Sequence, residues 1–280
     1  MQEVSNETKD MLQQELEVIR KWEEDQKGLW FWEKLGRLPF KILDRFTPQV
    51  VHNKIGQALD QLGSYLQGGG QYLISEKEIY NRFSKKTGEE NVDQEYITNL
   101  PLRVMDEVSG DLTVSRKRIA MTQGATTGIG GLFTLTIDIP FILGISLKTL
   151  QEIAISYGYD PNDKNERIFI VKCLQFTSSD IVGKQAILEE LSSFSTSDKK
   201  SSDQTISQIQ GWREVMISYR DNFGWKKLFQ MIPIAGMVFG SIINRGMVND
   251  IAETGRMLYK KRRIEERLAL LDKEQIREGH

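Results

Sequence analysis

Apolar side chains recur at helical spacing in the first part of the chain. Between residues 1 and 27 they follow one another at intervals that fit one face of a helix, and charged side chains fill most of the positions between them. The apolar set is Met11, Leu12, Leu16, Ile19 and Trp22. We therefore expect a polar amphipathic helix over residues 1–27 that packs on another part of the protein.

Similar patterns predict three further helices, over residues 50–66, 75–86 and 93–108. Three successive glycines, Gly68 to Gly70, end the first of them, because each glycine carries a large helix penalty. Asp111 stands where it can cap another helix, which carries the three cations Arg116 to Arg118.

The most distinctive stretch runs from Gly124 to Asp160 and is rich in glycine and nearly free of charge. Asp138 is the only ionised group in its first part, before Lys148. The helical pattern of this stretch ends at Gly158, because glycine commonly terminates helices.

Asp138 allows two interpretations. As a helix cap it supplies a side-chain acceptor, and Pro140 sets the backbone of the first turn, so that the helix breaks and restarts here. As a functional group it is a carboxylate within an apolar layer, where it pairs with a base such as Arg245 or governs a conformational switch. We favour the cap.

The C-terminal half begins with a strong start signal, because Asp160, Pro161 and Asp163 combine a capping carboxylate with proline and an acid in the first turn. We expect this helix to run to about Phe176. After a serine-rich loop, a second glycine-spaced apolar run over residues 230–244 precedes a polar helix over about residues 249–277.

Strand-like alternation of apolar and polar positions is scarce, so the expected fold class is all-α. We expect a single multi-helix domain with the two glycine-rich apolar segments packed at its centre, because their GxxxG spacings let helices approach closely. Its parts are the N-terminal helix of residues 1–27, a main block of residues 28–194, a flexible loop of residues 195–207 and a C-terminal part of residues 208–280.

Composition narrows the functional classes. The chain has 280 residues, of which 39% are hydrophobic and 27% charged, enough to bury a core. A formal net charge of -2 gives no overall attraction to nucleic acid, so no nucleic-acid partner is expected. The single cysteine, Cys173, excludes an intramolecular disulfide, and the acidic N-terminal segment lacks the apolar region of a secretory signal. We expect a cytoplasmic protein.

No cofactor, metal or catalytic site is predicted. The glycine motif at Gly128, Gly130 and Gly131 lacks the lysine and hydroxyl residue of a phosphate loop, and it does not fit the dinucleotide-binding pattern. With only His52 and His280 as histidines, neither a catalytic triad nor a zinc cluster can be assembled.

A membrane surface is a candidate partner. Residues 128–147 are about long enough to span a bilayer, but Asp138 and a proline lie among them, so we expect buried helices there instead. Aromatic and basic side chains together are typical of the headgroup region. The candidate contact made of both kinds comprises Trp30, Phe31, Trp32, Lys34, Arg37 and Lys41. The alternative is that these tryptophans pack in the core.

A second basic cluster, Lys260 to Arg263, allows the same two interpretations. It is either a further contact with an anionic leaflet or a solvated helix face balanced by Glu265 and Glu266.

Three blocks of sequence together resemble the motifs of the EcsC family, over about residues 20–270. The matching residues are Gly128, Gly130, Gly131, Asp138 and Pro140 in the first block, Gln151, Glu152, Tyr157, Asp160, Glu166 and Arg167 in the second, and Asn244 and Arg262 in the third. The second block is the most specific.

This family takes its name from a bacterial protein encoded beside the two components of an ABC transporter linked to secretion and competence. The resemblance therefore implies a non-enzymatic helical protein, peripheral at the inner face of the cell membrane, with transporter or secretion components as partners. It implies no catalytic residues. Two alternatives stay open: a carrier of a lipid or other apolar ligand in a cavity between the glycine-rich helices, and an unrecognised enzyme that uses buried carboxylates such as Asp138, Glu152 and Glu166.

Overall fold

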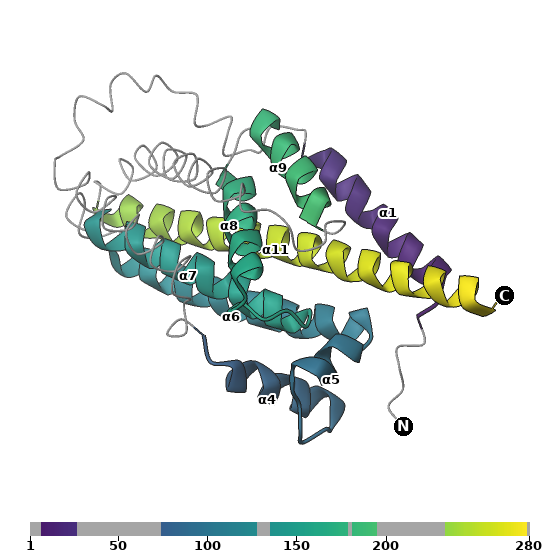
Figure 1. The fold of residues 1–280 in the computed structure, drawn as a ribbon. Helices are drawn as coiled ribbons and strands as arrows, with labels where there is room; N and C mark the ends of the chain where they lie inside the picture. Colours follow the sequence, from purple (N-terminus) through teal and green to yellow (C-terminus); the bar gives the residue numbers. More distant parts are fainter. Residues whose placement is uncertain (1–6, 27–73, 128–134, 179–180, 195–232, 279–280) are drawn as a thin grey trace.

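The computed structural model describes residues 7–26, 74–127, 135–178, 181–194 and 233–278 (Figure 1). Every regular element in these ranges is an α-helix, which confirms the all-α prediction. The helices are α1 Lys9–Asp25, α4 Glu76–Thr87, α5 Gln94–Asn99, α6 Leu102–Thr127, α7 Leu135–Ser156, α8 Lys164–Ser178, α9 Ile181–Phe194 and α11 Pro233–Glu278.

Helix α11 is the element around which the others pack. It is 46 residues long, or roughly 69 Å at the helical rise per residue. Helices α6, α7, α1 and α8 all lie against it (Figure 1). The predicted separation between an apolar run ending at residue 244 and a polar helix starting at residue 249 is wrong, because α11 passes through both. Val248 in this junction is fully buried, so packing sustains the helix there.

Helix α6 corrects two sequence predictions. The helix expected over residues 93–108 is two helices, α5 and α6, which meet at Pro101. Asp111 is not a cap, because α6 continues through it and leaves its side chain exposed. Leu112 and Thr113 beside it are buried, and their burial keeps this stretch helical. Asp93 is the residue that caps α5, since its carboxylate accepts the Tyr96 N–H at 2.7 Å.

Helix α7 begins earlier than predicted and ends where predicted. It starts at Leu135, so the backbone of Asp138 lies within the helix and Asp138 is not its N-cap. Gly158 follows the C-terminus with φ of 79°, which confirms its terminating role. Its N–H bonds the Ile155 carbonyl at 2.9 Å, and the Tyr159 N–H bonds the Ala154 carbonyl at 3.0 Å. These two bonds make a Schellman motif, which satisfies carbonyls that the helix leaves open.

Helix α8 starts three residues later than the start signal suggested. Asp163 is the capping residue, and its carboxylate accepts the Asn165 N–H at 2.7 Å. The Asp160 carboxylate accepts the Asn162 N–H at 2.8 Å and stabilises the turn that precedes the helix. This turn connects α7 to α8, which run in different directions (Figure 1).

The main core joins apolar faces from α1, α6, α7, α8, α9 and α11. Leu12, Leu16, Ile19 and Trp22 of α1 are buried as the sequence pattern predicts, whereas Met11 is 53% exposed. In the described part of the chain, no helix is both long enough and apolar enough to cross a bilayer.

Several predicted features lie outside the described residues. They are the aromatic and basic segment that includes Trp30, Phe31, Trp32, Lys34, Arg37 and Lys41, the helix over residues 50–66, the glycines Gly128, Gly130 and Gly131, and the loop of residues 195–207.

Candidate functional site

The candidate site is a charged hub made of four successive cations of α11: Lys260, Lys261, Arg262 and Arg263. Neighbouring residues of an α-helix point about 100° apart, so four in a row radiate in different directions around the helix. In this structure each of them reaches a different partner.

Lys260 and Lys261 connect α11 to α1. The Lys260 Nζ lies 2.7 Å from the Glu15 carboxylate of α1 and 2.7 Å from the Asp106 carboxylate of α6. The Lys261 Nζ donates to Glu23 of α1 at 2.8 Å. Asp106 also accepts the Tyr157 hydroxyl at 2.5 Å, so this carboxylate links α11 to both α6 and the end of α7. These two lysines therefore fix α1 and α6 on the central helix.

Arg262 binds the buried carboxylate of Glu166, on α8. Its Nη1 lies 3.1 Å and 2.8 Å from the two Glu166 oxygens, and the Tyr259 hydroxyl donates to one of them at 2.7 Å. The guanidinium also lies over the rings of Tyr159 and Phe169, at 4.2 Å and 5.1 Å from their centroids. Stacking on aromatic faces and a charged partner are both typical of arginine at a buried site.

Arg263 binds the C-terminus of α7. Its Nε and Nη2 donate to the Tyr157 carbonyl at 2.9 Å and 2.6 Å, and Nη2 also lies 3.3 Å from the Gly158 carbonyl. Carbonyls at the end of a helix lack intrahelical donors and carry partial negative charge. A buried guanidinium therefore completes the cap that Gly158 begins.

Neither interpretation of the cluster Lys260 to Arg263 from the sequence is correct as a whole, although Arg262 and Arg263 do pair with Glu266, as the second one expected. The four side chains are only 8–19% exposed, and their partners belong to the protein itself. The cluster is neither a contact with lipid nor a solvated helix face. The reason is tertiary, because α11 is surrounded by other helices where the cluster lies.

A second buried ion pair joins α6 to α7. The Arg116 guanidinium donates to both oxygens of the Glu152 carboxylate, from Nη2 to Oε1 and from Nε to Oε2, the latter at 2.6 Å. Glu78 of α4 lies 3.7 Å from the same guanidinium, and Lys148 lies 3.8 Å from Glu152. Together with Glu78, this ion pair connects α4, α6 and α7.

Burial raises the pKa of both buried glutamates. Loss of contact with solvent raises the pKa of the Glu166 carboxyl, and Arg262 and Tyr259 offset part of this rise. Burial likewise raises the pKa of Glu152, and Arg116 acts against it. In each case the arginine favours the charged carboxylate, and burial opposes it.

The comparisons with known proteins agree with the motifs at this hub. The family model of the EcsC protein family matches residues 13–264, nearly the whole chain. This protein belongs to the EcsC family. It is 57% identical to an uncharacterised protein, YdbA, of Bacillus subtilis (strain 168), over 96% of this chain and 98% of that protein. It is 26% identical to the protein EcsC of the same organism, over 82% of this chain and 86% of that protein. No solved structure matches.

The structure brings some of the EcsC-family motif residues together and leaves others apart. Tyr157, Glu166 and Arg262 meet at the hub. Glu152 belongs to the neighbouring ion pair. Asp160 lies in the turn before α8, and Arg167, in the first part of α8 itself, donates from its guanidinium to the Asn162 carbonyl of that turn. Gln151 is 1% exposed, and its Nε2 has no acceptor in the part of the chain that is described. For Asp138, Pro140 and Asn244 only the helical backbone is described.

Sequence reasoning missed several partners in this EcsC-family hub. Asp106 and Glu15 carry no signal in the sequence, because each lies far along the chain from the lysine that it binds. Tyr259 belongs to the third block that resembles the EcsC family, but nothing in the sequence pairs it with Glu166. The signal available in the sequence is the run of four cations within an amphipathic helix. These four side chains cannot all face solvent if the turns on both sides of them carry buried apolar residues. The sequence shows the run of cations but does not identify the carboxylates that pair with it.

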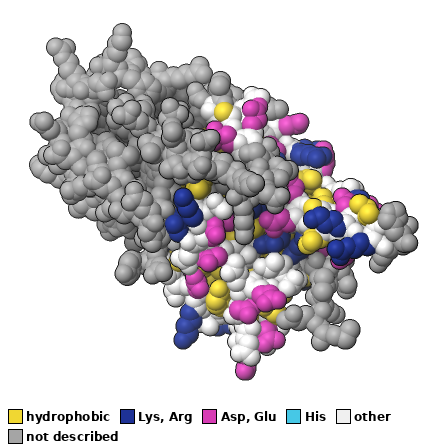
Figure 2. All heavy atoms as spheres, in the orientation of Figure 1, with side chains coloured by type: hydrophobic (Ala, Val, Ile, Leu, Met, Phe, Trp, Pro, Cys, Tyr) yellow, Lys and Arg dark blue, Asp and Glu magenta, His cyan; other side chains and the backbone are white. Residues whose placement is uncertain are grey.

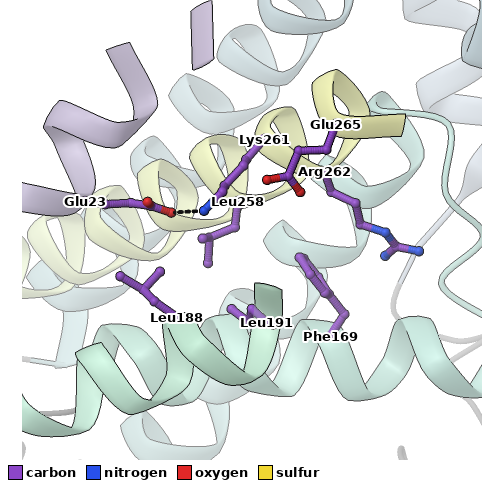
Figure 3. Close-up of a pocket in the computed structure, with 8 residues that line it drawn as sticks. All are labelled: Glu23, Phe169, Leu188, Leu191, Leu258, Lys261, Arg262 and Glu265. Atoms are coloured by element: carbon purple, nitrogen blue, oxygen red, sulfur yellow. Dashed lines mark hydrogen bonds and ion pairs between the residues drawn. The ribbon is translucent and has the colours of Figure 1, made fainter. Parts of the chain in front are cut away.

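A small pocket lies beside the hub, between α1, α8, α9 and α11 (Figure 3). Its apolar wall is formed by Phe169, Leu188, Leu191 and Leu258, and its rim carries Glu23, Lys261, Arg262 and Glu265. Figure 3 shows the Glu23–Lys261 ion pair at the rim and the Arg262 guanidinium directed away from that pair. The space accommodates roughly one water molecule, so this pocket is too small for a lipid chain. Within the described residues, no group of three or more His, Cys, Asp or Glu side chains could hold a metal ion.

Proposed function

We propose that this protein is a non-enzymatic helical accessory protein that works at the inner face of the bacterial cell membrane, in support of an ABC transporter or of protein secretion. The observation that carries the proposal is the internal pairing of the charged side chains of the hub and of the neighbouring Arg116–Glu152 pair. Glu166 and Glu152 are each held by an arginine of another helix. Side chains paired in this way support the fold, so the function is left to the surface of the protein.

Family membership supports the location and the role. The family is named after a protein encoded beside the components of an ABC transporter, and this chain matches the family model over residues 13–264. The described face in Figure 2 shows Lys and Arg beside Asp and Glu, which agrees with the net charge of -2 and with attachment by a local surface rather than by overall charge.

The membrane part of the proposal is tested by flotation of the purified full-length chain with vesicles. We expect the protein to float with vesicles that contain phosphatidylglycerol and to float less with phosphatidylcholine alone or at high salt, because screening weakens contacts with anionic headgroups. A protein that stays in the dense fraction with both vesicle types at low salt would contradict the membrane location.

The accessory role is tested separately in the cell. We expect deletion of the gene to reduce export of a secreted reporter, and the intact gene to restore it. Arg20→Gln, which changes an exposed side chain of α1, serves as a matched control and should restore export as well as the unchanged gene. Unchanged export in the deletion strain would contradict a role in secretion. The membrane location would then be judged by the flotation experiment alone.

A further inference from the structure

Helices α6 and α11 lie side by side and form a long seam (Figure 1). The Lys117 Nζ of α6 lies 2.8 Å from the Asn249 Oδ1 of α11. Seven positions earlier on α6 and seven positions later on α11, Gly110 lies opposite Arg256. The two helices therefore run antiparallel, and these two contacts define the part of the seam considered next.

Arg256 is half-buried in this seam and has no carboxylate partner among the described residues. Its one hydrogen bond within them is 3.5 Å long, from Nη2 to the Asp106 carbonyl, and its Nε is buried without an acceptor. By contrast, Arg116 and Arg262 each reach a carboxylate of another helix. A guanidinium between helices with so few acceptors is costly unless a ligand supplies them.

Two acids close to Arg256 are held by other donors. The Asp106 carboxylate accepts the Lys260 Nζ at 2.7 Å. Glu253, three positions before Arg256, accepts the Nε1–H of Trp22 of α1 at 2.9 Å. The charge of Arg256 is therefore not neutralised by an ion pair in the described part of the protein.

The Arg256 guanidinium lies flat against α6. A Cβ added at Gly110 would lie 3.9 Å from Nη2 and 4.0 Å from both Cζ and Nη1, so the plane of the group faces this glycine. Nη1 makes no hydrogen bond to any described residue. Gly110 is only half-buried, and Val114, one turn further along α6, is 54% exposed. The edge of the guanidinium is therefore accessible from the surface of the seam.

Lys117 is a second cation of the seam with no carboxylate partner among the described residues. Its Nζ is held by the amide oxygen of Asn249, which carries no charge. Asn249 and Arg256 are about 10 Å apart along the axis of α11. Lys117 therefore adds positive potential near Arg256 and does not share the same ligand oxygens.

We propose that this seam is a binding site for a phosphate group, which Arg256 contacts directly and Lys117 attracts from a longer distance. Inorganic phosphate or a phosphate monoester carries roughly −1.5 to −2 charge at neutral pH and presents three acceptor oxygens. It therefore matches two unpaired cations better than a single carboxylate does. The terminal nitrogens of a guanidinium bind such oxygens in pairs.

The phosphate group has two possible sources, a free phosphate-bearing molecule or the headgroup of a lipid with a terminal phosphate. Both present the same chemistry to Arg256. The site does not depend on the proposed membrane location, because a free molecule would occupy it equally well.

Isothermal titration calorimetry of the purified full-length chain with inorganic phosphate tests the site. Arg256→Gln should weaken binding about tenfold or more, because charge-assisted hydrogen bonds are lost. Lys117→Gln should weaken it about threefold, because a longer-range attraction is lost. Arg20→Gln removes an exposed cation of α1 and should bind phosphate as the unchanged protein does. Absence of binding at millimolar phosphate, or equal binding by Arg256→Gln, would overturn the inference.

Thermal unfolding distinguishes a ligand site from a structural role of Arg256. Without phosphate, Arg256→Gln should melt at the same temperature as the unchanged protein or slightly higher, because no ion pair is broken. With phosphate, the unchanged protein and Arg20→Gln should gain stability, and Arg256→Gln should not. A lower melting temperature of Arg256→Gln without phosphate, together with an undiminished gain on addition of phosphate, would assign a purely structural role and overturn the inference.

Flotation with phosphatidylcholine vesicles that contain phosphatidic acid distinguishes the two sources, because phosphatidic acid has a terminal phosphate. If Arg256→Gln floats less than the unchanged protein, the bound phosphate belongs to the lipid. If the two proteins float alike, or neither floats, while calorimetry shows binding that depends on Arg256, the phosphate belongs to a free molecule. Failure of every variant to float contradicts the membrane location alone, whereas loss of the calorimetric signal in the unchanged protein contradicts this site alone.

Discussion

At Gly158 the backbone adopts φ of 79°, in the left-handed region that favours glycine. The space around it is also full, since an added Cβ would lie 2.4 Å from the Thr98 Oγ1 and 3.0 Å from the Thr98 Cα. Gly88, which ends α4, has nearly the same φ of 78° but open space at the Cβ position. The two glycines therefore differ in packing and not in conformation.

Gly158→Ala should destabilise the protein more than Gly88→Ala. The left-handed backbone alone costs about 1 kcal/mol, which is the loss we expect at Gly88. At Gly158 the clash with the Thr98 backbone adds to it, for a total of about 3 kcal/mol. Urea unfolding followed by circular dichroism measures both variants. Equal losses would show that the close approach of Thr98 has no energetic weight.

Arg262→Met tests the buried pair with Glu166. Removal of one partner leaves an uncompensated buried charge, so we expect a loss of about 3 kcal/mol at neutral pH. A carboxyl whose folded pKa lies above its unfolded value contributes stability at low pH that is lost as pH rises through the folded pKa. Burial already raises the pKa of Glu166 from 4.5, and without Arg262 the rise is larger. The loss should therefore shrink as pH falls from neutrality toward 4.5.

Urea unfolding at several pH values measures this dependence. Arg20→Met removes an exposed arginine whose nearest carboxylate is 3.8 Å away, and it should change stability little at any pH. If the loss of stability in Arg262→Met stays constant with pH, Glu166 is not a charged group that Arg262 stabilises.

At the scale of the elements, α1 is attached to α11 by an apolar stripe and a row of charged contacts. Glu15 and Glu23 meet Lys260 and Lys261, and Trp22 donates to Glu253 at 2.9 Å. Lys9 of the first turn meets Asp272 near the end of α11. The apolar stripe holds the two helices together without defining their register. The charged contacts fix which residues of the two helices face each other.

Lys260→Met combined with Lys261→Met should loosen α1 and the attachment of α6 to α11, because Lys260 also binds Asp106 of α6. Both lysines are less than 20% exposed, at 14% and 19%, so their ion pairs are shielded from solvent. We expect amide hydrogen exchange to accelerate about tenfold in residues 9–25 and to stay unchanged in α7. Lys9→Met, which removes the exposed pair with Asp272, is the matched control and should have a small effect. Equal acceleration in α1 and α7 would mean that the lysines stabilise the whole bundle.

At the scale of the whole molecule, α11 makes the described helices interdependent. Helices from both ends of the chain share one apolar core, and α1 contacts the last part of the sequence. A bundle organised in this way is expected to unfold cooperatively, because removal of α11 exposes the apolar faces of all its neighbours.

Cys173 provides a direct measure of that cooperativity. The thiol is fully buried, and burial raises its pKa well above the ordinary value, so the native protein should react with a thiol reagent very slowly. In increasing urea, reactivity should appear at the same concentration at which the helical circular dichroism signal is lost. Cys173→Ser gives the background. Reactivity that appears well before the helical signal falls would show that α8 opens independently of the rest.

The sequence by itself determined the helical class, the buried stripe of α1, the terminating role of Gly158 and the family. These features depend on local spacing, or on motifs that are contiguous in the chain. The tertiary structure alone decided that Lys260 to Arg263 point inward, that Asp111 lies in mid-helix and that α11 is continuous. The reason is that partners such as Glu166, Asp106 and Glu15 lie 96, 154 and 245 positions from the residues they bind. Whether a charged run faces water or other helices depends on what packs around it, which local sequence does not contain.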